Sequence, residues 1–74
     1  MVLYLHPPQI EVEASVRRAL QEDLTPLGDL TAALVPAEAK ARGILAARQD
    51  GVLAGTACAT EAFRQIDATI AVTW

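Results

Sequence analysis

The spacing of apolar residues predicts a first amphipathic helix over Ile10 to Asp23. Apolar side chains recur there at every fourth position, which places them on one face of a helix. These residues are Val12, Val16, Leu20 and Leu24, with Ala19 beside them. Glu11 and Glu13 suit its beginning, where the helix dipole favours negative charge. Pro26 cannot donate to a continuing helix, so we expect the chain to leave it between Leu24 and Gly28.

A short helical turn is expected next, from Leu30 to Leu34. Asp29 precedes it and has the short acceptor side chain that suits a helix N-cap. Pro36 disfavours helical geometry at Val35, and therefore closes the turn.

A second amphipathic helix is predicted over Ala57 to Ile66, after a break at Gly55 and Thr56. Its apolar residues again share one face. They are Ala59, Ala62, Phe63 and Ile66.

Two segments have the pattern of β-strands. From Ala41 the sequence ARGILAAR carries apolar residues on both faces of an extended chain, which indicates a strand covered on both sides, although its alanine content leaves helix as an alternative. Asp50-Gly51 is a turn signal, and the extended run resumes over Val52 to Ala54, so a hairpin-like reversal is expected.

The last strand is predicted over Thr69 to Trp74, where Ile70, Val72 and Trp74 alternate with smaller or polar residues. Since the sequence stops inside this strand, we expect a truncated domain with an unpaired apolar edge. Such an edge is a template for another copy, so the segment is expected to self-associate.

The apolar period changes from about 3.6 to 2 and back, which predicts an α+β fold for residues 1–74. We expect one domain with two main helices and a small antiparallel sheet. The chain is 53% hydrophobic but has only three aromatic residues, so its core is small and a partner surface is expected.

Charge and composition exclude several classes of function. The net charge is −3, and the six basic residues are scattered, which disfavours nucleic-acid binding. No apolar run reaches the roughly 18 residues of a membrane span, and the first residues lack the basic region of a secretory signal. The single cysteine, Cys58, forms no internal disulfide and fits a reducing cytoplasm.

The acidic residues and the histidine have structural interpretations. Glu22, Asp23 and Asp29 resemble a metal or acid-base cluster, but capping and solvation explain them better. His6 has no further ligand at metal-binding spacing and lies beside a proline pair, so we interpret it as a loop histidine.

The other candidates also lack a chemical context. Cys58 lies in an alanine-rich helix without a nearby histidine, and is interpreted as core filler. Gly51 and Gly55 lack the lysine and hydroxyl of a phosphate-binding loop and are turn glycines. Arg17-Arg18 form a solvated face, with a partner contact as the alternative. We therefore predict no catalytic, substrate-binding or metal-binding residue in this chain.

Five short motifs occur in register along the chain. They are Leu20 to Leu24, Gly28 to Thr31, Val35-Pro36, Ala47 to Gly55, and Phe63 to Asp67. Together they resemble the N-terminal domain of the quinolinate phosphoribosyltransferases. The loop before Gly28 departs from the shorter glycine-containing turn frequent in that family.

The resemblance implies a parent enzyme with an N-terminal α/β sandwich and a β/α barrel. The barrel would bind 5-phosphoribosyl 1-pyrophosphate with Mg²⁺, outside this segment, and the enzyme would form nicotinate mononucleotide, CO₂ and pyrophosphate in NAD biosynthesis. The segment would be inactive alone and would serve domain closure and dimer assembly, with the missing barrel and a second subunit as its partners. Two alternatives remain: a related pyrophosphorylase-like protein associated with molybdenum transport, and a free-standing interaction module without enzyme activity.

Overall fold

The computed structural model describes residues 5–74 and contains two α-helices with a short 3₁₀ turn between them. Helix α1 spans Gln9–Leu24, the turn η1 spans Ala32–Leu34, and helix α2 spans Thr56–Ile66. Both predicted helices are confirmed, each to within one residue at either end.

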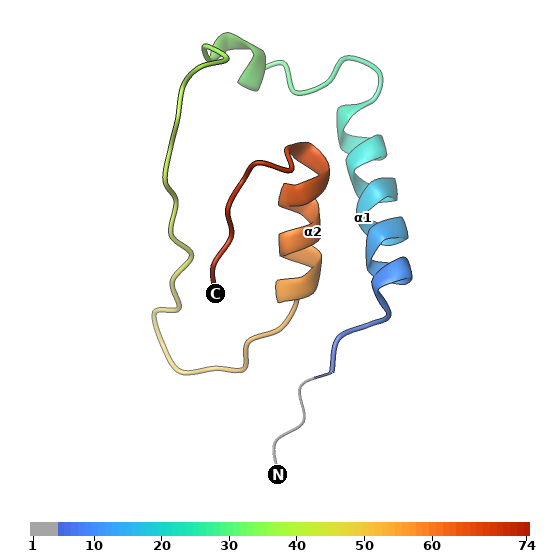
Figure 1. Ribbon diagram of the computed structural model, residues 1–74, viewed down its shortest axis with the longest axis vertical. Helices are drawn as coiled ribbons and strands as arrows, with labels where there is room; N and C mark the ends of the chain where they lie inside the picture. The colour runs from blue at the N-terminus through green and yellow to red at the C-terminus, as the bar shows by residue number, and fades with distance from the viewer. Residues whose placement is uncertain (1–4) are drawn as a thin grey trace.

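Helices α1 and α2 lie side by side and run in the same direction (Figure 1). Contacts across the pair advance together along the two helices, from Gln9 with Glu61 to Gln65 with Glu13. A short loop would make neighbouring helices antiparallel. The parallel arrangement therefore depends on the long connection over residues 25–55, which returns the chain to the end where α1 begins (Figure 1).

The contact between the helices contains a small apolar core. Val12 and Val16 on α1 are 2% and 8% exposed, and they are the only buried hydrophobic residues within 5–74. Leu20 and Leu24 continue the same face and are half-buried. The predicted face of α1 is thus confirmed, except that Ala19 is exposed.

The turn after α1 is held by Asp29. Its Oδ1 accepts hydrogen bonds from the backbone N–H groups of Thr31 and Ala32, at 3.1 and 3.0 Å. Val35 is extended, with φ −90° and ψ 134°, as expected for a residue before proline. Both the capping interaction of Asp29 and the closure of the turn at Pro36 are confirmed.

The predicted antiparallel sheet is wrong, because residues 5–74 contain no strand. Residues 41–54 are neither strand nor helix, so both interpretations of this segment fail. A β-propensity becomes a strand only when a second backbone supplies hydrogen-bond partners, and residues 41–54 form no backbone hydrogen bond with another extended segment. Asp50-Gly51 therefore does not join two paired strands, and Val52 is 97% exposed.

The segment after α2 is also not a strand. Asp67 Oδ1 accepts hydrogen bonds from the backbone N–H and the hydroxyl of Thr69, at 2.9 and 2.7 Å, which turns the chain back beside the helix. Trp74 then donates from Nε1 to Thr60 Oγ1 on α2, at 2.8 Å. Residues 69–74 therefore offer no strand edge through which the chain could self-associate, although many apolar side chains remain exposed.

The chain is more open than a globular domain of its length. Its radius of gyration is 14.8 Å, whereas about 11 Å is typical of a compact chain of this size. No helix within residues 5–74 combines the length and apolar character that crossing a membrane requires.

Candidate functional site

A buried carboxylate, Glu61, lies at the centre of the contact between α1 and α2. Its side chain is 2% exposed and accepts hydrogen bonds from side chains of both helices. Arg64 donates from Nε at 3.0 and 2.8 Å and also from its NH2 group, as an ion pair one turn along α2. Gln65 donates at 3.2 Å, and Gln9 on α1 at 3.4 Å. We call Gln9, Glu13, Glu61, Arg64 and Gln65 the polar seam.

Within the polar seam, the charges of Glu61 and Arg64 compensate one another. The hydrogen bonds from Arg64 lower the pKa of Glu61 to about 2, against the opposing effect of burial. The same contact raises the pKa of Arg64 above its usual value. Glu61 is consequently ionised at neutral pH, and its charge is neutralised by a guanidinium that is itself 55% exposed.

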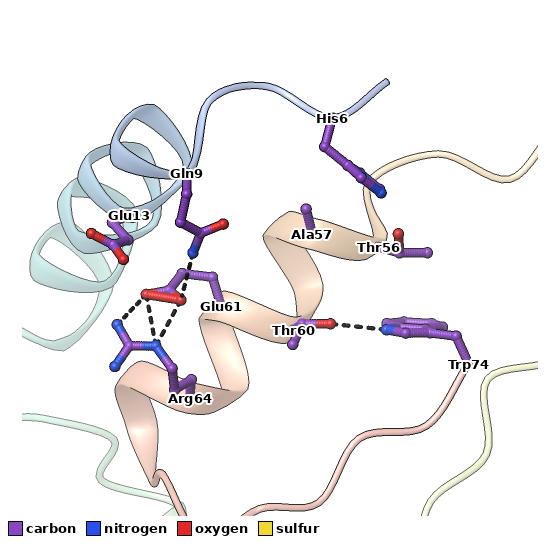
Figure 2. Close-up of a pocket in the computed structure, with 9 residues that line it drawn as sticks. All are labelled: His6, Gln9, Glu13, Thr56, Ala57, Thr60, Glu61, Arg64 and Trp74. Carbon is purple, nitrogen blue, oxygen red and sulfur yellow. Dashed lines mark hydrogen bonds and ion pairs between the residues drawn. The ribbon is translucent and has the colours of Figure 1, made fainter. Parts of the chain in front are cut away.

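A polar pocket of about 630 Å³ lies beside the seam, at the end where both helices begin (Figure 2). The residues that line it are His6, Gln9, Glu13, Thr56, Ala57, Thr60, Glu61, Arg64 and Trp74. General acid-base catalysis needs a titratable group free to exchange a proton with a substrate, whereas Glu61 is held by Arg64. Arg64 is the one Lys or Arg side chain among the described residues that line the pocket, whereas a polyanionic substrate needs several cationic donors.

A second hollow, of about 750 Å³, is mainly apolar. It lies between α2, the connection and the segment after α2. Its large apolar lining residues are Ile44, Leu45, Phe63, Ile70, Val72 and Trp74, which we call the apolar groove.

The acidic residues singled out in the sequence do not come together as a metal site. Asp29 holds its turn, while Glu22 and Asp23 are exposed near the end of α1. Within residues 5–74, no group of three or more His, Cys, Asp or Glu side chains could hold a metal ion.

The remaining candidates are dispersed. His6 is exposed and lines the polar pocket. Arg17 and Arg18 are exposed on α1, in keeping with a solvated face. Gly55 has φ +83° at the start of α2, a left-handed conformation that confirms it as a turn glycine. Cys58 is exposed, so its interpretation as core filler is wrong: no other segment of residues 5–74 buries the side of α2's first turn on which it lies.

The sequence interpretation missed Glu61. A carboxylate in a helix is usually solvated, and its burial depends on α1, which is distant in sequence. One signal was present: Glu61 and Arg64 have the i, i+3 spacing of a helical ion pair.

The chain is similar to several plant enzymes. It is 35% identical over 68 residues to a rice (Oryza sativa) protein described as a chloroplastic carboxylating nicotinate-nucleotide pyrophosphorylase, with 90% of this chain and 18% of the rice protein covered. An Arabidopsis thaliana protein with the same description is 32% identical, with 90% and 20% covered. A mitochondrial quinolinate phosphoribosyltransferase of Nicotiana tabacum is also 32% identical, with 90% and 19% covered.

The chain thus spans about a fifth of the length of these relatives. No family model matches it. No solved structure matches it either.

Proposed function

We propose that the chain is a segment of a quinolinate phosphoribosyltransferase, an enzyme of NAD biosynthesis, because the relatives to which it is similar are described as such enzymes. The enzyme transfers the phosphoribosyl group of 5-phosphoribosyl 1-pyrophosphate to quinolinate, and releases CO₂ and pyrophosphate with nicotinate mononucleotide. The observation that carries this proposal is the 35% identity with the rice enzyme across 90% of the chain.

We assign the reacting groups to the rest of the enzyme and a supporting role to this segment. Both substrates are polyanions, whose binding requires several cationic donors. In the polar pocket Arg64 is already paired with Glu61. We also assign Mg²⁺ to residues outside this segment; within residues 5–74, no three His, Cys, Asp or Glu side chains come together in a way that could hold a metal ion.

The supporting role is domain closure and assembly, with the missing barrel domain and a second subunit as partners. The exposed apolar groove supports this role, because large apolar surfaces of soluble proteins mark contact sites.

We also propose a cytoplasmic location, which the unpaired Cys58 supports. The plant relatives are described as chloroplastic or mitochondrial, so fractionation of the source cells is the relevant measurement.

The similarity to these plant enzymes favours the quinolinate enzyme over a protein associated with molybdenum transport. A free-standing interaction module is the remaining alternative. It would not support catalysis when placed in an enzyme of the family.

Genetic complementation tests the proposal. The stretch of the rice enzyme that aligns with this chain is replaced by this chain's residues, and the chimera is expressed in bacteria that lack quinolinate phosphoribosyltransferase. We expect growth without added nicotinate. The matched control, the rice enzyme with the stretch deleted, should not support growth. A soluble chimera of native assembly that gives no growth would contradict the proposal.

A further inference from the structure

The contacts between α1 and α2 define one alignment of the two helices. Gln9 on α1 donates a hydrogen bond to Glu61 on α2, at 3.4 Å (Figure 2). One turn further along both helices, Gln65 donates to the main-chain oxygen of Glu13, at 3.0 Å. Residues four apart lie on the same face of a helix. The nearest alternative is therefore an alignment in which α2 is displaced along α1 by one turn, about 5.4 Å.

The apolar part of the contact distinguishes poorly between these alignments. Apolar side chains recur at every turn of α1, as Val12, Val16, Leu20 and Leu24, so a displacement of one turn replaces each by another of its kind. The connection does not hold the alignment either, because no backbone hydrogen bond joins residues 36–54 to α1 or α2. A long connection of this kind can absorb a displacement of one turn.

Glu61 would enter less favourable surroundings in either displaced alignment. Displacement toward the end of α1 would place its carboxylate beside Glu13 instead of Gln9, and two carboxylates that share a site repel each other. Displacement the other way would place Glu61 level with Leu5, before α1 begins, where no side chain could donate to it. Since Glu61 is 2% exposed, water cannot compensate for either change.

We propose that Glu61 sets the alignment of α2 on α1, because its buried carboxylate is compatible with the amide of Gln9 and incompatible with the carboxylate of Glu13. A buried polar residue can select one register among apolar contacts that are alike. The same alignment assembles the polar pocket, whose lining includes Gln9 and Glu13 from α1 and Thr60 and Arg64 from α2. The inference rests on the contacts between the helices and not on the proposed enzyme activity.

An exchange of two residues on α1 tests the proposal, namely Gln9→Glu combined with Glu13→Gln. The composition and the net charge are conserved, but the glutamine is placed one turn further along α1. We therefore expect α2 to follow it by one turn, about 5.4 Å. The new alignment brings Arg64 toward Arg17, but both are exposed, so their repulsion is weakened by water.

Nuclear Overhauser contacts of the Gln65 side-chain amide report the alignment. In the wild type the amide protons should contact Glu13, whereas in the exchange variant they should contact Arg17. The matched control is Gln21→Glu combined with Glu22→Gln, which exchanges the same residue types at exposed positions of α1 and should retain the wild-type contacts.

Cys58 provides a second measurement, because it is the only cysteine of the chain and is exposed on α2. A nitroxide attached to Cys58 broadens the amide signals of nearby residues of α1. In the exchange variant the centre of this broadening should move by about four residues toward the end of α1.

An exchange variant that is helical by circular dichroism and retains the contact of Gln65 with position 13 would overturn the proposal. A control that displaces α2 as far as the exchange does would overturn it too. If the exchange variant is not helical, Glu13→Gln alone decides the matter. Without the repelling carboxylate, Gln65 should contact positions 13 and 17, and contact with position 13 alone would contradict the proposal. None of these results affects the complementation test of enzyme function.

Discussion

Gln65 on α2 donates a hydrogen bond from Nε2 to the main-chain carbonyl oxygen of Glu13 on α1, at 3.0 Å. The same amide group donates to the carboxylate of Glu61, at 3.2 Å. Gln65 thus joins the buried charge to the backbone of the opposite helix. The parallel pair is held by this polar seam together with the valines of α1, because the apolar face of α2 lies elsewhere.

Truncating a buried valine of the small core should destabilise the packing of α1 against α2. We expect Val12→Ala to lower the free energy of unfolding by about 1–3 kcal/mol, from lost burial and the cavity that remains. Ile10→Ala is the control, because Ile10 is on the same helix and 73% exposed; its effect should stay within about 0.5 kcal/mol. Urea unfolding followed by circular dichroism measures both. Equal effects would show that α1 and α2 do not pack as described.

The polar seam depends on the carboxylate of Glu61. Glu61→Ala removes the acceptor for Gln9, Arg64 and Gln65 together. We expect the melting temperature to fall by roughly 5 °C or more for a chain of this length. Glu38→Ala, at an exposed position, should leave it unchanged. A melting curve of Glu61→Ala that superimposes on the wild type would show that the seam contributes nothing.

The lowered pKa of Glu61 predicts a dependence of stability on pH. The pKa of Glu61 falls from 4.5 to about 2 in the folded chain. As the pH is lowered, Glu61 is therefore protonated at a higher pH in the unfolded state than in the folded state. The stabilisation is complete above pH 4.5 and is lost as the pH falls toward 2. Asp67, whose pKa is also lowered by Thr69, acts in the same direction.

Comparison of the wild type with Glu61→Gln isolates the contribution of Glu61. Unfolding measured between pH 6 and 2.5 should show a steeper loss of stability for the wild type, while Asp67 contributes equally to both proteins. Parallel pH profiles would mean that Glu61 is not paired with Arg64 in solution.

Asp29 should control the turn after α1 without affecting the helix pair. Asp29→Ala removes the acceptor for the N–H groups of Thr31 and Ala32. The local cost should be about 1 kcal/mol, while Asp29→Asn keeps an acceptor and should cost little. Amide hydrogen exchange at Thr31 and Ala32 should accelerate in the alanine variant alone. Unchanged exchange there would contradict the capping interaction.

The helices could be predicted from the sequence because their signals are local. The four-residue repeat beginning at Val12 fixed the face of α1, and the side chain of Asp29 fixed the position of the next turn. The repeat in α2 correctly identified an apolar face. It could not show that this face is turned away from α1, since that depends on how two distant segments meet.

The strands were predicted wrongly and the buried charge of Glu61 was missed for the same reason, because both depend on contacts between segments that are distant in the sequence. The β-propensity of residues 41–54 and 69–74 requires a partner backbone, and the described chain does not provide one. Glu61 is buried only because α1 covers it and Arg64 compensates it. Cys58 is exposed for the converse reason, since nothing within residues 5–74 covers its side of the helix.

The central claim is that this chain belongs to a quinolinate phosphoribosyltransferase and supplies none of its substrate contacts. The most direct measurement is the Michaelis constant of the purified chimera for quinolinate and for 5-phosphoribosyl 1-pyrophosphate, beside that of the rice enzyme. If the chain only supports the fold, the chimera should form nicotinate mononucleotide with both constants within about threefold of the rice values. An active chimera in which either constant changes by more than about tenfold would show that the chain contacts substrate, and would contradict the account.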